Sequence, residues 1–274
     1  LRQALGLELA LRDVFAQPTL QGLAHATAPA SGADHGAIAL VARGGPLPLS
    51  SAQQRLWFLD QLDHAAGAAY HIPAGLRLHG VLDRAALRAS LDTIVARHES
   101  LRTTFVLVDG QAAQAIAERC EFVLLEHDVS ALDPAQRPDA VLRLAAEEAE
   151  APFDLGAGPL IRGRLLHLSQ QEHVLLVTQH HIVSDGWSIG VLIEEVNTLY
   201  TAFSQGLANP LPALAIQYAD YAAWQSDSMR GVALQRQVGF WRSHLSGAPA
   251  LLELPTDRPR PAAQSYRGSY VPMC

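Results

Sequence analysis

Residues 173–178 read His-Val-Leu-Leu-Val-Thr, a mostly apolar run that is typical of a strand buried in the centre of a sheet. Shortly after it, residues 187–204 place apolar side chains at helical spacing, which predicts a helix with one apolar face. A buried strand that leads directly into such a helix indicates α/β layering. Ligand sites of α/β proteins gather at these junctions, so the stretch from Gln179 to Ser188 is the first place to look for chemistry.

The rest of the chain alternates in the same way. We predict a helix capped by Asp83 and a second helix over residues 134–150. Strand-like patterns occur at 74–79, 101–107, 112–116, 121–126 and 160–168. In the last of these, Arg162 and Arg164 alternate with apolar residues, which predicts one buried and one solvated face. The pattern as a whole predicts a mixed sheet covered by helices.

Composition limits the classes of function. The chain has 274 residues with 49% hydrophobic and 17% charged residues, enough for a real core. A net charge of −7 gives no electrostatic footprint for nucleic acid or an anionic membrane, and no run of ~18 apolar residues occurs. The two cysteines, Cys120 and Cys274, form neither a disulfide framework nor a metal-binding pair, which favours a reducing cytoplasm.

The first 46 residues differ in character from the rest of the chain. Residues 1–25 suggest two short helices around a turn, and residues 27–46 are rich in Ala, Gly and Pro, as an interdomain linker would be. Structured sequence is expected to start at Leu47. Because the chain lacks an initiator Met and begins inside a helix-like pattern, we interpret it as a segment of a longer polypeptide.

The pair His180-His181 is open to three interpretations. Adjacent residues of an extended segment point to opposite faces, so the pair is poorly placed to bind one metal ion, and zinc sites use other spacings. Both imidazoles at a strand end can be structural. Alternatively, one faces the core while the other faces a cavity and acts in acid–base chemistry, since imidazole titrates near neutral pH. The residues alone leave the last two interpretations open.

His180 to Gly186 (HHIVSDG) resembles the HHxxxDG signature of the condensation-domain superfamily of non-ribosomal peptide synthetases, which shares its fold with chloramphenicol acetyltransferase. Three further motifs of that family occur in the expected order and spacing: 51–59 (SAQQRLWFL), 97–105 (RHESLRTTF) and 218–224 (YADYAAW). The resemblance covers residues 47–272. Residues 1–25 resemble the last two helices of a peptidyl carrier domain, whose phosphopantetheine-bearing serine would lie upstream.

The resemblance implies roles for individual residues. His181, the second histidine of the motif, is the expected catalytic residue. Supporting or structural roles are expected for His180, Asp185, Gly186 and Arg55, with Arg55 as the ion-pair partner of Asp185 and Gly186 allowing a sharp turn. Ser188 and Trp187 are candidate substrate contacts, whereas Tyr218, Tyr221 and Trp224 are expected to pack. No metal and no directly bound cofactor are implied.

The expected function is peptide-bond formation between a carrier-bound aminoacyl or peptidyl thioester and the α-amine of a carrier-bound acceptor. The partners implied are upstream and downstream carrier domains, which present phosphopantetheine, and an adjacent adenylation domain. A dual condensation–epimerisation domain and a non-catalytic docking module remain as alternatives.

The family fold implies four parts. These are the carrier helices (1–26), the linker (27–46), an α/β N-terminal lobe of the chloramphenicol-acetyltransferase type (47–215), and an inter-lobe segment with the start of a second lobe (216–274). Because the family's tunnel needs both lobes, we expect the 274-residue chain alone to be inactive.

Overall fold

The computed structural model describes residues 16, 19–26, 37–62, 67, 69–259 and 261. The contacts divide the chain into two compact units, Leu1–Ala37 and Ile38–Cys274. In the first unit one helix is described, α3 (Leu20–Ala26). The remainder of the expected carrier segment lies outside the described residues, so its assignment stays a prediction.

A four-stranded mixed sheet lies at the centre of the second unit. Its strand order is β2 (His71–His79), β7 (Glu172–His180), β6 (Ile161–Ser169) and β5 (Val123–Asp128). The β5–β6 pair is parallel and the other two pairs are antiparallel. Strand β7 is flanked on both sides and is buried from His173 to His180, which confirms that the apolar run forms a central strand.

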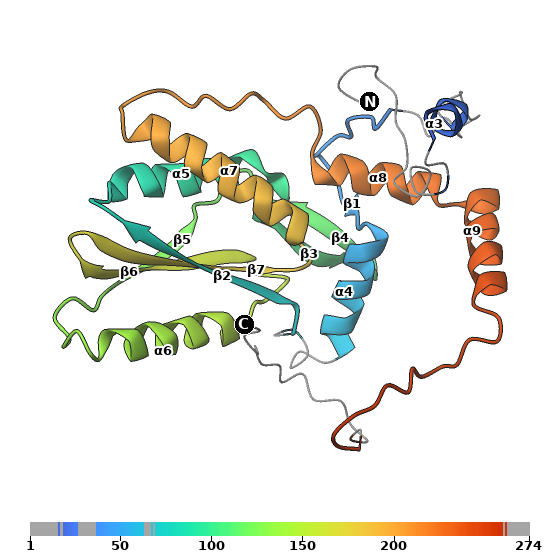
Figure 1. Cartoon of the computed structure of the whole chain (residues 1–274). Coiled ribbons are helices and arrows are strands. Elements are labelled where there is room, and N and C mark those ends of the chain that lie inside the picture. Colours follow the sequence, from blue (N-terminus) through green and yellow to red (C-terminus); the bar gives the residue numbers. More distant parts are fainter. Residues whose placement is uncertain are drawn as a thin grey trace. The chain divides into compact units, whose positions relative to one another are not determined.

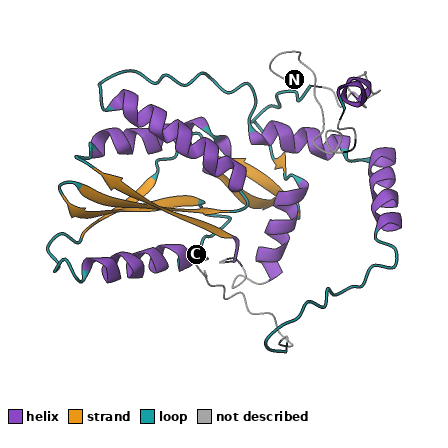
Figure 2. Cartoon of the chain, viewed as in Figure 1, coloured by secondary structure: helices purple, strands orange, loops and turns teal. Residues whose placement is uncertain are grey.

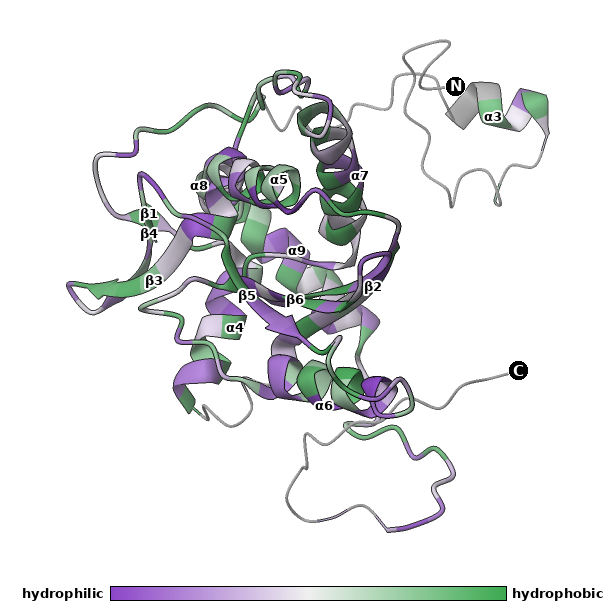
Figure 3. Cartoon of the chain, turned by 90° about the vertical axis from the view of Figure 1, so that its left-hand side faces the viewer, coloured by the Kyte–Doolittle hydropathy of each residue, from purple (hydrophilic) through white to green (hydrophobic). Residues whose placement is uncertain are grey.

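Helices cover both faces of this sheet. Figures 1 and 3 show α5 (Arg84–Arg97) and α7 (Gly186–Phe203) on one face and α6 (Arg137–Glu150) on the other. Asp83 begins α5 as predicted, since its carboxylate accepts a hydrogen bond from the Ala86 amide at 2.9 Å. The core between the sheet and the first pair of helices includes Ile94, Leu165 and Leu199, all nearly inaccessible to solvent.

The second face of β6 is covered, not solvated. Arg162 and Arg164 lie against α6, where their Nε atoms contact the carboxylate of Glu148 at 2.8 and 2.7 Å. Glu148 is only 2% exposed, and the Arg162 guanidinium also stacks over the Phe153 ring. The prediction of a solvated face was therefore wrong: the arginine side chains point into a helix–sheet interface, where the buried Glu148 pairs with both and Glu147 also pairs with Arg164.

A smaller sheet lies beside the first (Figure 2), with strand order β1 (Leu47–Pro48), β4 (Gln111–Ile116) and β3 (Thr103–Val108). The described residues of the second unit also form α4 (Ser51–Leu62), the 3₁₀ turn η2 (Glu99–Arg102), α8 (Tyr218–Ser228) and α9 (Gly231–His244). Helix α9 buries none of its residues. Among the described residues, no helix is both long enough and apolar enough to span a bilayer.

Candidate active site

The two histidines occupy opposite sides of the end of β7. The His180 amide donates to the Leu160 carbonyl just before β6 at 3.0 Å, and the His181 amide donates to the Tyr70 carbonyl at 2.8 Å. Strand pairing thus fixes the backbone up to His181. The His180 side chain is 2% exposed, whereas His181 lies on the exposed side, as expected for neighbours in an extended segment.

A backbone contact determines which ring nitrogen of His181 is free. Its Nδ1 lies 2.9 Å from the carbonyl oxygen of Ser184. A carbonyl oxygen only accepts, so Nδ1 must carry the proton in this contact. In the neutral ring the other nitrogen, Nε2, then holds a lone pair. The loop thereby presents a base or hydrogen-bond acceptor at Nε2.

His180 supports the turn that carries His181. Its Nδ1 accepts a hydrogen bond from the Ile182 amide at 3.1 Å, so it must be unprotonated at that atom. Burial, followed by the charges of His71 and His181, lowers the pKa of His180 to about 4. The rings of Tyr70, His71 and Phe153 surround it. This arrangement supports the structural role expected for His180.

Asp185 caps α7. Its Oδ1 accepts from the backbone amide of Ser188 at 2.8 Å and from the Ser188 hydroxyl at 2.6 Å. These hydrogen bonds are the main reason that the pKa of Asp185 lies below its usual value. A role in loop architecture is thus supported, but the expected partner is not: no ion pair between Asp185 and Arg55 occurs in the described part of the chain. Arg55 is exposed, and the capping bonds already satisfy the carboxylate locally.

A cavity of about 250 Å³ brings most of the predicted residues together. Of the residues predicted from sequence, it is lined by His181, Asp185, Ser188 and Arg55. The lining also includes Tyr70, Ser100 and Tyr218, which the sequence did not assign to the site. For Tyr218 a signal existed, since it opens one of the recognised motifs. Its hydroxyl lies 2.9 Å from the Ser50 hydroxyl instead of being packed away.

Three predicted residues do not line this cavity: the buried His180, Trp187 and Gly186. Trp187 is 85% exposed and lines a neighbouring cavity of about 140 Å³, together with Ser188. Gly186 lines neither cavity. Its φ lies outside the left-handed region, and a Cβ atom added there would meet no atom within 4 Å. Neither the backbone conformation nor the space around Gly186 therefore requires glycine at this position.

The RHESLRTTF segment joins α5 to α7. Arg97 Nε and His98 Nε2 contact the two carboxylate oxygens of Glu195 at 3.0 and 2.6 Å. These contacts support the structural interpretation of Arg97 and His98.

Among the described residues, no group of three or more His, Cys, Asp or Glu side chains is arranged to hold a metal ion.

Comparisons with known proteins agree with this outline. The family model described as Condensation domain matches residues 44–272. The chain is 46% identical over 275 residues to a subunit of the linear gramicidin synthase of Brevibacillus parabrevis, and 48% identical over 274 residues to malpibaldin synthetase of Mortierella alpina. Each match covers 98% of this chain but only 4% and 5% of the relative, so the chain spans a small part of these proteins.

Two solved structures illustrate the shared fold. The X-domain from teicoplanin biosynthesis is 37% identical with a TM-score of 0.71, and the match covers 83% of this chain and 49% of that one. The first condensation domain of the calcium-dependent antibiotic synthetase, in complex with substrate analogue 2a, is 25% identical with a TM-score of 0.65; the match covers 75% of this chain and 49% of that one.

Proposed function

The chain belongs to the condensation-domain family of non-ribosomal peptide synthetases, and we propose that it serves peptide-bond formation, with His181 as the catalytic residue. In the proposed reaction, the α-amine of a carrier-bound acceptor attacks the carbonyl carbon of a carrier-bound aminoacyl or peptidyl thioester. A C–N bond forms, the C–S bond breaks, and the proton lost by the amine ends on the departing thiolate. The observation that carries this proposal is the free Nε2 of His181 in a loop that lines a cavity.

The geometry of His181 suits a proton acceptor. Because its Nδ1 donates to the Ser184 carbonyl, the Nε2 lone pair is available to accept a hydrogen bond from the incoming amine or to take its proton. A free α-amine has a pKa near 8, so a fraction is neutral before attack and a strong base is unnecessary. General-base help is typically worth about 10²–10⁴-fold, and positioning contributes on a similar scale.

The other cavity residues supply the surroundings. Asp185 and Ser188 line the cavity at the capped N-terminus of α7, and Tyr218 lines it from α8. These polar groups are spaced among apolar side chains such as Leu56 and Val183, a lining that fits the acyl end of a thioester. We propose Ser188 as a substrate contact in this cavity and Trp187 as one in its neighbour.

The substrates in this proposal arrive on partner domains. Upstream and downstream carrier domains present them as thioesters of phosphopantetheine, and an adjacent adenylation domain loads the acceptor. No cofactor bound by the chain itself is proposed. The reducing cytoplasm is the proposed compartment, and the free thiol of Cys120 is compatible with it.

Reconstitution of the full-length synthetase tests the proposal. Its carriers are loaded with donor and acceptor aminoacyl groups, and the downstream carrier is analysed by mass spectrometry. The proposal predicts that the donor residue appears on the downstream carrier as a dipeptidyl thioester. Loaded carriers that stay unchanged while the protein remains folded would argue against it.

A docking module is the second candidate. A structure described as a complex of the X-domain and OxyB from teicoplanin biosynthesis matches the chain with a TM-score of 0.69 and 35% identity. A fold of this kind is thus found bound to another protein. If this chain docks partners without catalysis, the reconstituted synthetase will recruit a partner but leave both loaded carriers unchanged.

A further inference from the structure

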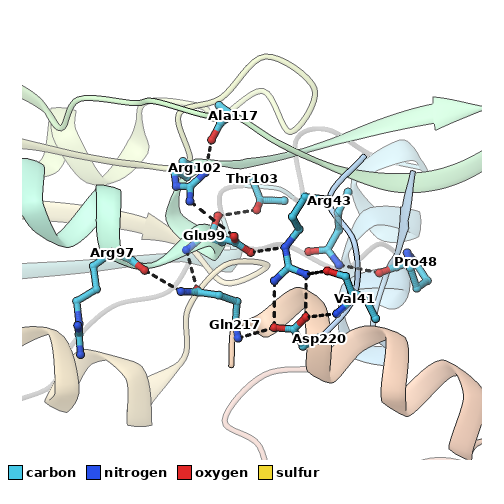
Figure 4. A network of polar contacts seen from close by, with 11 residues as sticks. Val41, Arg43, Pro48, Arg97, Glu99, Arg102, Thr103, Ala117, Gln217 and Asp220 are labelled. Atoms are coloured by element: carbon cyan, nitrogen blue, oxygen red, sulfur yellow. Dashed lines mark hydrogen bonds and ion pairs between the residues drawn. The ribbon is translucent and has the colours of Figure 1, made fainter. Parts of the chain in front are cut away.

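The segment just before the first strand is anchored to the condensation fold. Residues 38–43 fall within the second compact unit, although the sequence placed them in the linker. The Arg43 guanidinium lies between two carboxylates that come from different elements (Figure 4). Its Nη1 and Nη2 contact the two oxygens of Asp220 in α8 at 2.8 and 3.0 Å, and its Nε contacts Glu99 in η2 at 2.9 Å.

Asp220 is the centre of this arrangement. Its side chain is inaccessible to solvent, and a buried carboxylate is costly unless it is paired and hydrogen-bonded. Besides Arg43, it accepts hydrogen bonds from the Val41 amide and the Gln217 amide, both at 2.8 Å. The bond to Arg43 is the largest contribution that lowers the pKa of Asp220 to about 2, so the carboxylate is charged at neutral pH. A two-point contact of this kind fixes geometry as well as charge.

Gln217 ties the same two elements together a second time. Its Oε1 accepts from the Glu99 amide at 3.0 Å, and its Nε2 donates to the Arg97 carbonyl at 2.9 Å. Side-chain contacts thus bind the start of α8 to the junction of α5 and η2. Arg43, which lies in the segment before β1, contacts both η2 and α8.

Both elements contribute to the wall of the His181 cavity. Ser100, which directly follows Glu99, lines it from η2, and Tyr218, which directly follows Gln217, lines it from α8. The contacts that Arg43 and Gln217 make to η2 and α8 therefore lie close in sequence to the cavity wall. A shift between the two elements would move Ser100 and Tyr218 apart and widen the cavity.

We propose that Arg43 is a positioning residue for the His181 cavity: this linker residue holds η2 and α8 at the separation that shapes the substrate site. The proposal has a structural part that is independent of the reaction, and a kinetic part that rests on the proposed function. Because Arg43 contacts the elements that carry the wall residues Ser100 and Tyr218, and not His181, its loss is expected to weaken substrate binding more than the chemical step.

The test uses the full-length protein with Arg43→Gln, which removes the charge but keeps a polar side chain. Hydrogen–deuterium exchange is expected to increase over residues 97–102 and 217–225 and to stay unchanged over α6. In the condensation assay, KM for the acceptor is expected to rise about tenfold, because the charged hydrogen bonds of Arg43 are lost. The value of kcat is expected to stay within about threefold of wild type. Arg43→Lys keeps the charge and is expected to recover part of the KM.

Arg143→Gln is the matched control, since Arg143 is an exposed residue of α6 paired to Glu147 at i,i+4. It should leave exchange and kinetics at the wild-type values. Wild-type exchange in both segments of Arg43→Gln would overturn the proposal, and so would altered exchange with an unchanged KM. If the synthetase forms no peptide bond at all, the exchange experiment still decides the structural part separately from the proposed function.

Discussion

The imidazole of His181 donates a hydrogen bond from Nδ1 to the carbonyl oxygen of Ser184, three residues further along the same loop, at 2.9 Å. The contact selects one tautomer and fixes the orientation of the ring. It depends on a turn that is itself stabilised by the His180 ring and by the Asp185 cap. His180 and Asp185 thus bond to backbone amides close in sequence to this contact.

His180 is expected to make stability depend on pH. Its folded pKa is about 4 against 6.5 in the unfolded chain, so the unfolded state binds a proton first as the pH falls through this window. The contribution of the neutral His180 to stability is fully present above the unfolded pKa. It is lost progressively as the pH falls from the unfolded pKa to the folded pKa. His180→Asn keeps an acceptor for the Ile182 amide but does not titrate. Urea unfolding at about pH 7 and about pH 5 measures the free energy of unfolding at each pH. The difference between the two values should be roughly 2 kcal/mol smaller in this variant than in the wild type.

A wild-type pH dependence that His180→Asn leaves unchanged would contradict the burial of a neutral ring at this position. His79→Ala, at an exposed histidine of β2, provides a control for the general effect of losing one imidazole.

Asp185 should act through its capping oxygen and not through an ion pair. Asp185→Ala removes the acceptor for the Ser188 amide and is expected to lower stability by about 1 kcal/mol, whereas Asp185→Asn retains that acceptor and should cost only a few tenths. Thermal or chemical unfolding of the two variants measures the difference. Equal destabilisation by both would mean that the negative charge, and so a partner such as Arg55, matters more than the cap.

Glu148 is expected to be among the most sensitive positions of the sheet–helix interface. Glu148→Ala leaves Arg162 without its carboxylate partner and Arg164 with only the more distant contact to Glu147, and breaking such a buried set costs about 3–5 kcal/mol. Glu147→Ala, one residue earlier and 45% exposed, should cost about 1 kcal/mol or less. Denaturant unfolding of both variants checks this; similar losses for the pair would contradict the burial assigned to Glu148.

Gly186→Ala is expected to be tolerated. The backbone there needs no glycine-specific φ, a Cβ meets no atom within 4 Å, and alanine is the better helix former by up to about 1 kcal/mol. Stability should be unchanged or slightly higher, with condensation unaffected. If condensation fails while the unfolding curve is normal, the acyl group must approach the Gly186 backbone more closely than the cavity lining indicates.

Local periodicity accounts for what the sequence predicted well. The apolar run became β7, Asp83 became the cap of α5, and His180 and His181 faced opposite ways because neighbours in a strand must. The alternation in β6 led to the wrong prediction that the face of Arg162 and Arg164 is solvated. A period of two distinguishes the two faces of a strand, but it does not show which element covers each face.

Pairings across long separations were not predictable in this way. Arg43 and Asp220 lie 177 positions apart, and no local pattern links them. Asp220 also makes a local contact, because its carboxylate accepts a hydrogen bond from the Gln217 amide at the start of α8. An acidic residue at this position is consistent with a helix start, but it does not reveal that the same carboxylate binds a linker arginine.

The central claim is that the Nε2 of His181 acts on the incoming amine. His181→Asn tests it in the full-length synthetase, because the asparagine amide can still donate to the Ser184 carbonyl but has no atom in place of Nε2. The single-turnover rate of dipeptidyl thioester formation is predicted to fall by about 10²–10⁴-fold while the unfolding transition stays at its wild-type position. A rate within about threefold of wild type would contradict the claim.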